Sequence, residues 1–219
     1  MKKLALLSFV LLLFVACQND KTPQKSNSQD TVKKETSEQW RIDTEKSEIE
    51  WTAFKTTDKV PVKGTFKSFG FTSENENGSL LDLLKTAKAN VNVSSIFSDN
   101  EDRDKKLVDY FFEKMIGTKY ITARVDSVDE SKQTAMVTLK MNAHEKTIPM
   151  SYNIDEGKDI INLKGTIDVV KDFAASDALQ ALNKACYDLH KGPDGISKTW
   201  SEVEVLAKLK FYKIIKKEK

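Results

Sequence analysis

Ile161-Asn162-Leu163-Lys164-Gly165-Thr166-Ile167-Asp168-Val169 is the stretch that decides the fold class, because apolar or small residues alternate with polar ones throughout it. A period of two places all the apolar side chains on one face of an extended strand. Such a strand belongs to a sheet with one buried face and one solvated face, which is typical of antiparallel sheets. The same period recurs along the chain at 49–53, 62–66, 135–141 and 203–211, with shorter runs at 89–95, 119–127 and 147–154.

About eight strands separated by short connections predict an antiparallel barrel or sandwich. Phe69 and Phe71 fall out of phase with Phe66, which predicts a bulge or corner near Lys67-Ser68. The fold class expected from these patterns is all-β, with short helices inserted between strands.

Three stretches interrupt the alternation and predict helices. Residues 79–88 follow Ser79, a good N-cap residue. Residues 98–115 begin with Ser98 and Glu101 at the spacing of a capping box, and Asn100 can also cap this helix. A third helix is expected to begin at Ser176 or Asp177, with an apolar stripe made of Leu179, Leu182, Cys186 and Leu189.

Cys186 lies inside that stripe, so we expect a buried core thiol with a raised pKa and no reactivity. A reactive or metal-binding thiol is the alternative interpretation. The chain has one other cysteine, Cys17, and its position near the N-terminus gives it a different meaning.

Cys17 ends a segment with the three parts of a secretory signal: Lys2 and Lys3, the apolar run 4–15, and the small residue Ala16. A cysteine at the cleavage position makes this segment similar to a bacterial lipoprotein signal, which implies that Cys17 is acylated. The alternative is an ordinary cleaved signal followed by an incidental cysteine. We therefore expect a signal peptide at 1–16, a flexible lipidated tether at 17–38 and a barrel domain at 39–214.

This organisation predicts a protein of the bacterial cell envelope, anchored in a membrane through acylated Cys17 on the periplasmic side. Gln18 in place of Asp favours the outer membrane over the inner one, by analogy with known sorting rules. Removing 1–16 takes Lys2 and Lys3 from the 35 basic residues and leaves 33 basic against 33 acidic residues. A net charge near zero gives no electrostatic case for nucleic acid as a partner.

No catalytic signature is present in the sequence: there is no G-x-S-x-G, no H-E-x-x-H and no phosphate loop. His144 is expected in an exposed hairpin turn, and His190 in the last turn of the third helix, where positive charge favours the helix dipole. Asp99, Asp102 and Asp104 cluster, but the glycine of a calcium-binding EF-hand loop is missing. The prediction is a protein that is not an enzyme and has no metal; catalysis by His144 or the cluster near Asp102 is the least favoured hypothesis.

One internal stretch of sequence is more distinctive of a protein family than any other part of the chain. Residues 95–104 (SIFSDNEDRD), followed by Leu107 and Phe111-Phe112, resemble the signature of the YceI-like family. Residues 40–51 (WRIDTEKSEIEW) and 62–69 (VKGTFKSF) are similar to two further segments of that family, in the same order. The resemblance implies an eight-stranded antiparallel lipocalin-like barrel, and some members hold a polyisoprenoid or another amphiphile in the interior.

The residues expected to face inward are the candidate ligand-binding residues, namely Trp51, Ala53, Phe66, Ala135, Val137, Leu139, Leu163, Ile167, Ala207, Leu209 and Phe211. Small residues also fall on the inward faces: Ala53, Gly64, Ala123, Ala135, Gly165 and Ala207. They are compatible with a packed barrel of tapering width or with a tube that holds one slender chain.

The resemblance favours the tube, and with it a long-chain ligand such as a polyisoprenoid, a quinone-like molecule or a fatty acyl chain, with no cofactor. The alternative is an interaction protein with a packed barrel that docks a partner through 170–200, where the chain departs from the family pattern. Family members also pair into homodimers, so a homodimer is a further possible assembly.

Overall fold

The alternating stretch 161–169 forms strand β9 (Ile160–Asp168) up to Asp168, and its alternation is confirmed, since Ile161, Leu163 and Ile167 are buried. The computed structural model describes residues 38–75 and 78–215. The remaining strands are β1 (Glu38–Lys55), β2 (Val60–Phe66), β3 (Phe69–Ser73), β4 (Ala87–Asn92), β5 (Ile96–Phe97), β6 (Tyr120–Asp129), β7 (Thr134–Met141), β8 (His144–Asp155) and β10 (Thr199–Ile215).

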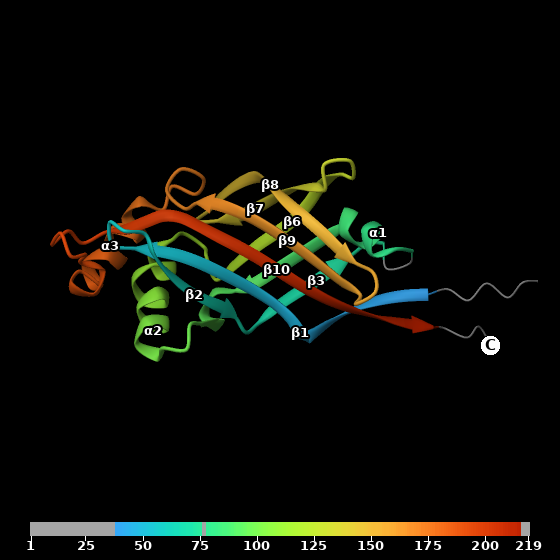
Figure 1. The fold of residues 1–219 in the computed structure, drawn as a ribbon, viewed down its shortest axis with the longest axis horizontal. Coiled ribbons are helices and arrows are strands. Elements are labelled where there is room, and N and C mark those ends of the chain that lie inside the picture. The colour runs from blue at the N-terminus through green and yellow to red at the C-terminus, as the bar shows by residue number, and fades with distance from the viewer. Residues whose placement is uncertain (1–37, 76–77, 216–219) are drawn as a thin grey trace, which may run out of the picture. The chain divides into compact units, whose positions relative to one another are not determined.

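These ten described strands form one sheet in the order β3-β4-β6-β7-β8-β9-β10-β1-β2-β5, and every pairing is antiparallel. The sheet is strongly curved and forms a half-barrel (Figure 1). The all-β antiparallel class is confirmed, but the count of eight strands is wrong. The two additional strands are β3, which follows the corner, and the two-residue β5.

The corner at Lys67-Ser68 explains how one chain segment serves two parts of the sheet. β2 pairs with β1 before the corner, and β3 pairs with β4 after it. Ser95 holds the corner: its carbonyl oxygen accepts from the Lys67 amide (3.0 Å), and its Oγ accepts from the Ser68 amide (3.0 Å). The predicted break near Lys67-Ser68 is therefore confirmed, and the family string begins at the residue that supports it.

Three short helices accompany the sheet, α1 (Leu80–Lys85), α2 (Glu101–Tyr110) and α3 (Ser176–Ala185), with three 3₁₀ turns, η1 (Val93–Ser95), η2 (Phe112–Lys114) and η3 (Asp188–His190). Figure 1 shows α1 towards one end of the sheet, with α2 and α3 towards the other. α1 buries Leu80, Leu83 and Leu84, and it is shorter than the predicted helix 79–88.

The predicted helix caps are partly wrong. Ser79 caps α1 in a full capping box with Asp82. α2 is capped by Asn100, whose side chain accepts from the Arg103 amide (2.9 Å), and not by Ser98. Ser98 Oγ instead donates to Asp104 Oδ1 at 2.5 Å, which ties the preceding loop to the helix.

α3 begins without any side-chain cap, so the prediction of Ser176 or Asp177 as its N-cap is wrong; Ala175 occupies that position. Leu182 and Cys186 are buried as expected, but Leu189 is 60% exposed. Leu189 lies beyond the end of α3 in η3, where the helical phase of the stripe no longer holds.

Candidate functional site: an apolar cavity inside the half-barrel

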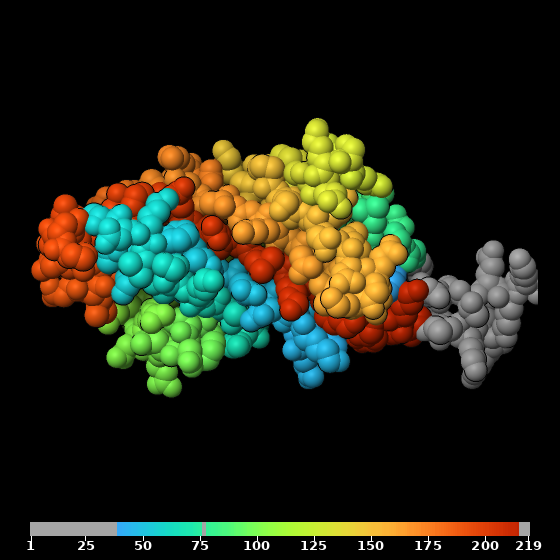
Figure 2. All heavy atoms as spheres, viewed as in Figure 1, coloured from blue at the N-terminus to red at the C-terminus, as the bar shows by residue number. Residues whose placement is uncertain are grey.

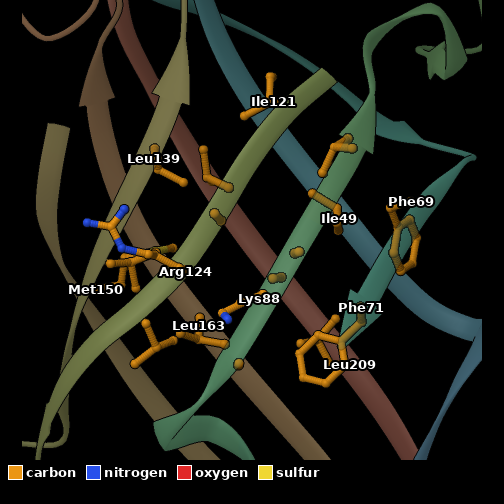
Figure 3. Close-up of a pocket in the computed structure, with 18 of the residues that line it drawn as sticks. Ile49, Phe69, Phe71, Lys88, Ile121, Arg124, Leu139, Met150, Leu163 and Leu209 are labelled. Carbon is orange, nitrogen blue, oxygen red and sulfur yellow. The ribbon is translucent and has the colours of Figure 1, made fainter. Parts of the chain in front are cut away.

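The concave face of the sheet encloses a cavity of about 150 Å³. We call it the main cavity. Its walls come from β1, β2, β3, β4, β6, β7, β8, β9 and β10, and Leu84 of α1 and Phe173 also border it. Figure 3 shows Ile49, Phe69, Phe71 and Leu209 on one side and Leu139, Met150 and Leu163 on the other. The alternation of the strands directs these apolar side chains inward.

Eight of the eleven candidate ligand-binding residues line the main cavity: Trp51, Phe66, Val137, Leu139, Leu163, Ile167, Ala207 and Leu209. Ala53 lines a second cavity instead. Ala135 and Phe211 are fully buried and do not border the main cavity, although both lie on inward faces. Phe211 packs edge-on against Phe71, with ring centroids 5.4 Å apart. It therefore holds in place a side chain that lines the main cavity.

Several residues that line the main cavity were not among the predicted ligand-binding residues. Phe69 and Phe71 were recognised only as out of phase, and that phase shift was the signal for a new inward face after the corner. Ile121 and Met150 alternate within the short runs 119–127 and 147–154, so extending the inward face to those runs would have found them. Phe173 follows β9 in an irregular segment that carries no such signal.

The small inward residues do not all contribute to open space. A Cβ on Gly64 would lie 2.3 Å from Trp51 Cζ2 and 2.5 Å from the Phe97 carbonyl oxygen, so the Trp51 ring packs directly over this glycine. A Cβ on Gly165 would lie 2.8 Å from Met150 Cγ. These glycines make room for large neighbours, whereas Ala123 and Ala207 border the main cavity. The interior is therefore packed in some layers and open in others.

The two cations at the margin of the main cavity, Lys88 and Arg124, are paired with neighbouring carboxylates. Lys88 and Arg124 face each other across β4 and β6 (Figure 3). Lys88 Nζ lies 2.7 Å from Glu74 Oε1, and Arg124 Nε lies 2.9 Å from Asp126 Oδ1. The main cavity thus offers apolar contact and no free charge from these two residues to orient a ligand.

The second cavity, of about 380 Å³, lies where β1, α2 and α3 meet, and Cys186 and His190 border it. Cys186 is a free, buried thiol, and burial raises its pKa. The predicted core setting of Cys186 is confirmed. His190 lies in η3, and its Nδ1 lies 2.6 Å from Thr199 Oγ1.

Burial, reinforced by the nearby Lys55 charge, lowers the pKa of His190 to about 4 from its ordinary value of 6.5. The imidazole is therefore neutral at pH 7. The prediction that a positive charge on His190 favours a helix dipole is wrong, because the half-buried ring lies beside a lysine rather than at a free helix end.

The lowered pKa of His190 predicts that the stability of the fold depends on pH. Since the unfolded chain binds the His190 proton more tightly, the free energy of unfolding should be constant above about pH 6.5 and fall as the pH drops towards 4. Because the ring is partly exposed, we expect a loss of about 1 kcal/mol, well below the full value of the shift. Urea unfolding at pH 7 and pH 4.5 measures this loss. His190→Gln should remove it and the control His144→Gln should not; equal losses in all three proteins would refute the assignment.

The residues of the catalytic hypothesis do not converge. His144 is exposed at the β7–β8 hairpin, as predicted, with Nδ1 2.6 Å from the Asn142 carbonyl oxygen. Asp102 is exposed on α2 at the margin of the second cavity. Within 38–75 and 78–215, no cluster of histidine, cysteine and carboxylate side chains is suited to holding a metal ion.

The described architecture agrees with a known family over most of the chain. Residues 40–211 match the YceI-like domain. The chain belongs to the YceI-like family. The resemblance inferred from the string at 95–104 is therefore confirmed.

One curated protein is similar to this chain in sequence, and two solved structures are similar to it in fold. A UPF0312 protein of Staphylococcus epidermidis is 32% identical over 92 residues, which cover 42% of this chain and 53% of that protein. The chain thus spans about half the length of the curated relatives it matches. BcnA of Burkholderia cenocepacia has a TM-score of 0.54 at 12% identity, covering 78% of this chain and 99% of BcnA. A polyisoprenoid binding domain from Saccharophagus degradans, implicated in plant cell wall breakdown, has a TM-score of 0.57 at 14% identity, covering 83% and 100%.

The predictions about the N-terminus concern the signal peptide at 1–16, Cys17 and nearly all of the tether at 17–38. They lie outside the described residues. In the part of the chain that the structure describes, none of the helices has the length and apolar character needed to cross a bilayer.

Proposed function

We propose that this YceI-like protein binds a single long-chain lipid in the main cavity. The observation that carries the proposal is the almost wholly apolar lining of that cavity, which combines aromatic and aliphatic side chains from nine strands. The candidate ligands are a polyisoprenoid, a quinone-like molecule and a fatty acyl chain. The solved relative from Saccharophagus degradans is described as a polyisoprenoid binding domain, which supports the first of these.

The main cavity is small for a long-chain lipid, so binding requires some side chains to move. About 150 Å³ is below the range of about 300–1,000 Å³ that is usual for small-molecule sites. A long chain therefore requires side chains in the packed layers to change rotamer. Met141 and Met150 border the cavity and are the side chains best suited to do so, because methionine is unbranched and flexible.

Affinity on this account grows with chain length. Each buried methylene contributes about 0.8 kcal/mol, and Lys88 and Arg124 are already paired with carboxylates. The ligand is thus retained by contact along its tail, and no catalytic step is involved.

We further propose that acylated Cys17 anchors the protein in a membrane of the bacterial envelope, the outer membrane in preference to the inner one. The signal-like segment ending at Ala16 supports this proposal. An anchor at Cys17 would keep the protein at the membrane surface. Lipid released from or delivered to the membrane would then travel a short distance.

A binding titration tests the lipid-binding proposal. We suggest the Cys17→Ser chain, which lacks the acylation position, titrated with a fluorescent polyisoprenol and with a fluorescent fatty acyl methyl ester, neither of which carries a charged head group. Saturable binding at one probe per chain, displaced by unlabelled lipid of increasing length with increasing efficiency, is the expected result. The proposal fails if neither probe binds saturably, or if displacement does not depend on chain length.

The alternative, a protein that docks a partner through 170–200, has one observation in its favour. Tyr187, Leu189 and Ile196 in that segment are 51%, 60% and 56% exposed. Large exposed apolar side chains close together in sequence are typical of interaction surfaces. A homodimer through this segment is one form of the alternative, and sedimentation analysis of the Cys17→Ser chain would reveal it.

A further inference from the structure

The second cavity differs from the main one in its chemistry. Its apolar part is formed by Trp51, Ala53, Val62, Leu107, Leu182 and Cys186. The segments that border it are gathered at one end of the molecule in Figure 2, where the β1–β2 hairpin (cyan), α2 (green) and the 170–200 segment (orange to red) lie together. At about 380 Å³, it lies within the usual range of small-molecule sites without any rearrangement.

Three cations border this cavity: Lys55, Arg103 and Lys106 are all half-buried. Lys55 Nζ donates to the Leu189 carbonyl oxygen (3.2 Å). None of the three forms an ion pair with the residues of 38–75 and 78–215, in contrast to Lys88 and Arg124 at the main cavity. Removing a cation from water without a partner is unfavourable, so this arrangement attracts an anion.

The other polar groups of the second cavity leave this positive balance in place. Asp102 is the one carboxylate among its lining residues, and it is exposed to solvent. His190 is neutral at pH 7 because burial lowers its pKa to about 4. Asn100 and Thr199 are uncharged.

Trp51 supplies an independent observation. It is 6% exposed and borders both cavities, so its ring separates them. Its indole Nε1 has no hydrogen-bond partner among the described residues. Buried tryptophan N–H groups usually have an acceptor. A ligand oxygen beside Trp51 would provide one.

From these observations we propose that the second cavity is a separate binding site for an anionic single-chain amphiphile. Its anionic head lies among Lys55, Arg103 and Lys106, and one of its oxygens accepts a hydrogen bond from Trp51 Nε1. Its tail contacts the apolar part near Leu107 and Leu182. This site goes beyond the lipid-binding function of the main cavity, because it selects by head-group charge whereas the main cavity selects by chain length.

The test compares head groups on one tail, using the Cys17→Ser chain as the parent protein. Hexadecanoate, hexadecyl phosphate, hexadecanol and inorganic phosphate are titrated by calorimetry. The double variant Arg103→Gln/Lys106→Gln should bind hexadecanoate and hexadecyl phosphate about tenfold more weakly, while hexadecanol binding stays unchanged. Lys208→Gln, on the outer face of the sheet and away from both cavities, is the charge control and should retain full affinity for both anions.

A second pair of variants separates the two cavities. Ala53→Phe fills the second cavity and should weaken hexadecanoate binding with no effect on a polyisoprenol probe. Ala207→Phe fills the main cavity and should weaken binding of the polyisoprenol probe with no effect on hexadecanoate binding. Thermal unfolding of each variant confirms that it is folded.

Three results would overturn the proposal. One is equal affinity of the double variant and its parent for hexadecanoate. Another is loss of hexadecanoate binding in Ala207→Phe but not in Ala53→Phe, which would place the acid in the main cavity. The third is binding of inorganic phosphate as tightly as hexadecyl phosphate, which would mean an ion site without a tail. Failure of the main-cavity function would appear separately, as loss of polyisoprenol binding in the parent chain.

Discussion

Replacing Ala207 by Phe is expected to reduce the affinity for a polyisoprenoid probe by at least about tenfold, the largest change in binding that we predict for one residue. Ala207 lies in β10 between Ile49 of β1 and Leu163 of β9, and all three residues border the main cavity. A phenyl ring at this position would occupy much of the roughly 150 Å³ available. The tail of a ligand would then lose the contacts that provide most of its binding free energy.

The control for this variant is Lys208→Phe. Lys208 is the neighbouring residue, it is exposed, and its side chain points to the opposite face of the sheet. The same ring added there should leave probe affinity within a factor of about two, which lies within the usual spread for surface changes. Ala207→Val should have an intermediate effect. If Ala207→Phe binds the probe as tightly as Lys208→Phe, the ligand does not occupy the main cavity.

Replacing Phe211 by Ala is expected to lower the free energy of unfolding by about 3–5 kcal/mol, the largest loss of stability that we predict. The Phe211 side chain is fully buried and packs edge-on against Phe71. Its backbone amide also donates to the Asp159 carbonyl oxygen (2.8 Å), so the strand remains in place and the removed ring leaves a cavity.

Chemical denaturation measures this loss, and the adjacent residue provides the control. Tyr212 is 47% exposed, so Tyr212→Ala should cost about 1 kcal/mol or less. An unfolding free energy for Phe211→Ala close to that of Tyr212→Ala would contradict the packing described for β10.

Alternation predicted the strands well because burial on one face imposes it directly. The runs at 135–141 and 203–211 fall within observed strands, and the run at 161–169 does so up to Asp168. The strand count could not be predicted in the same way. β5 has two residues, which is too short for any period, and β3 changes phase at a corner held by Ser95, a contact between distant parts of the chain.

The candidate site was only partly predictable because inward direction does not determine which side chains meet open space. Ala135 and Ala207 both lie on inward faces, but Ala135 is fully buried whereas Ala207 borders the main cavity. The difference depends on which side chains reach across from the facing wall, as Met150 does over Gly165. Local sequence also failed to identify the second cavity, since Lys55, Arg103 and His190 come together only through the tertiary fold.

Native mass spectrometry of the Cys17→Ser chain, purified without detergent from its own host, tests the central claim most directly. We predict a bound mass of one long-chain lipid per chain that disappears on organic extraction and is absent from Ala207→Phe but present in Lys208→Phe. An unliganded mass in all three proteins, together with no uptake of polyisoprenoid or acyl probes by the parent chain, would contradict the lipid-binding account. The exposed residues of 170–200 would then become the first candidate for the function.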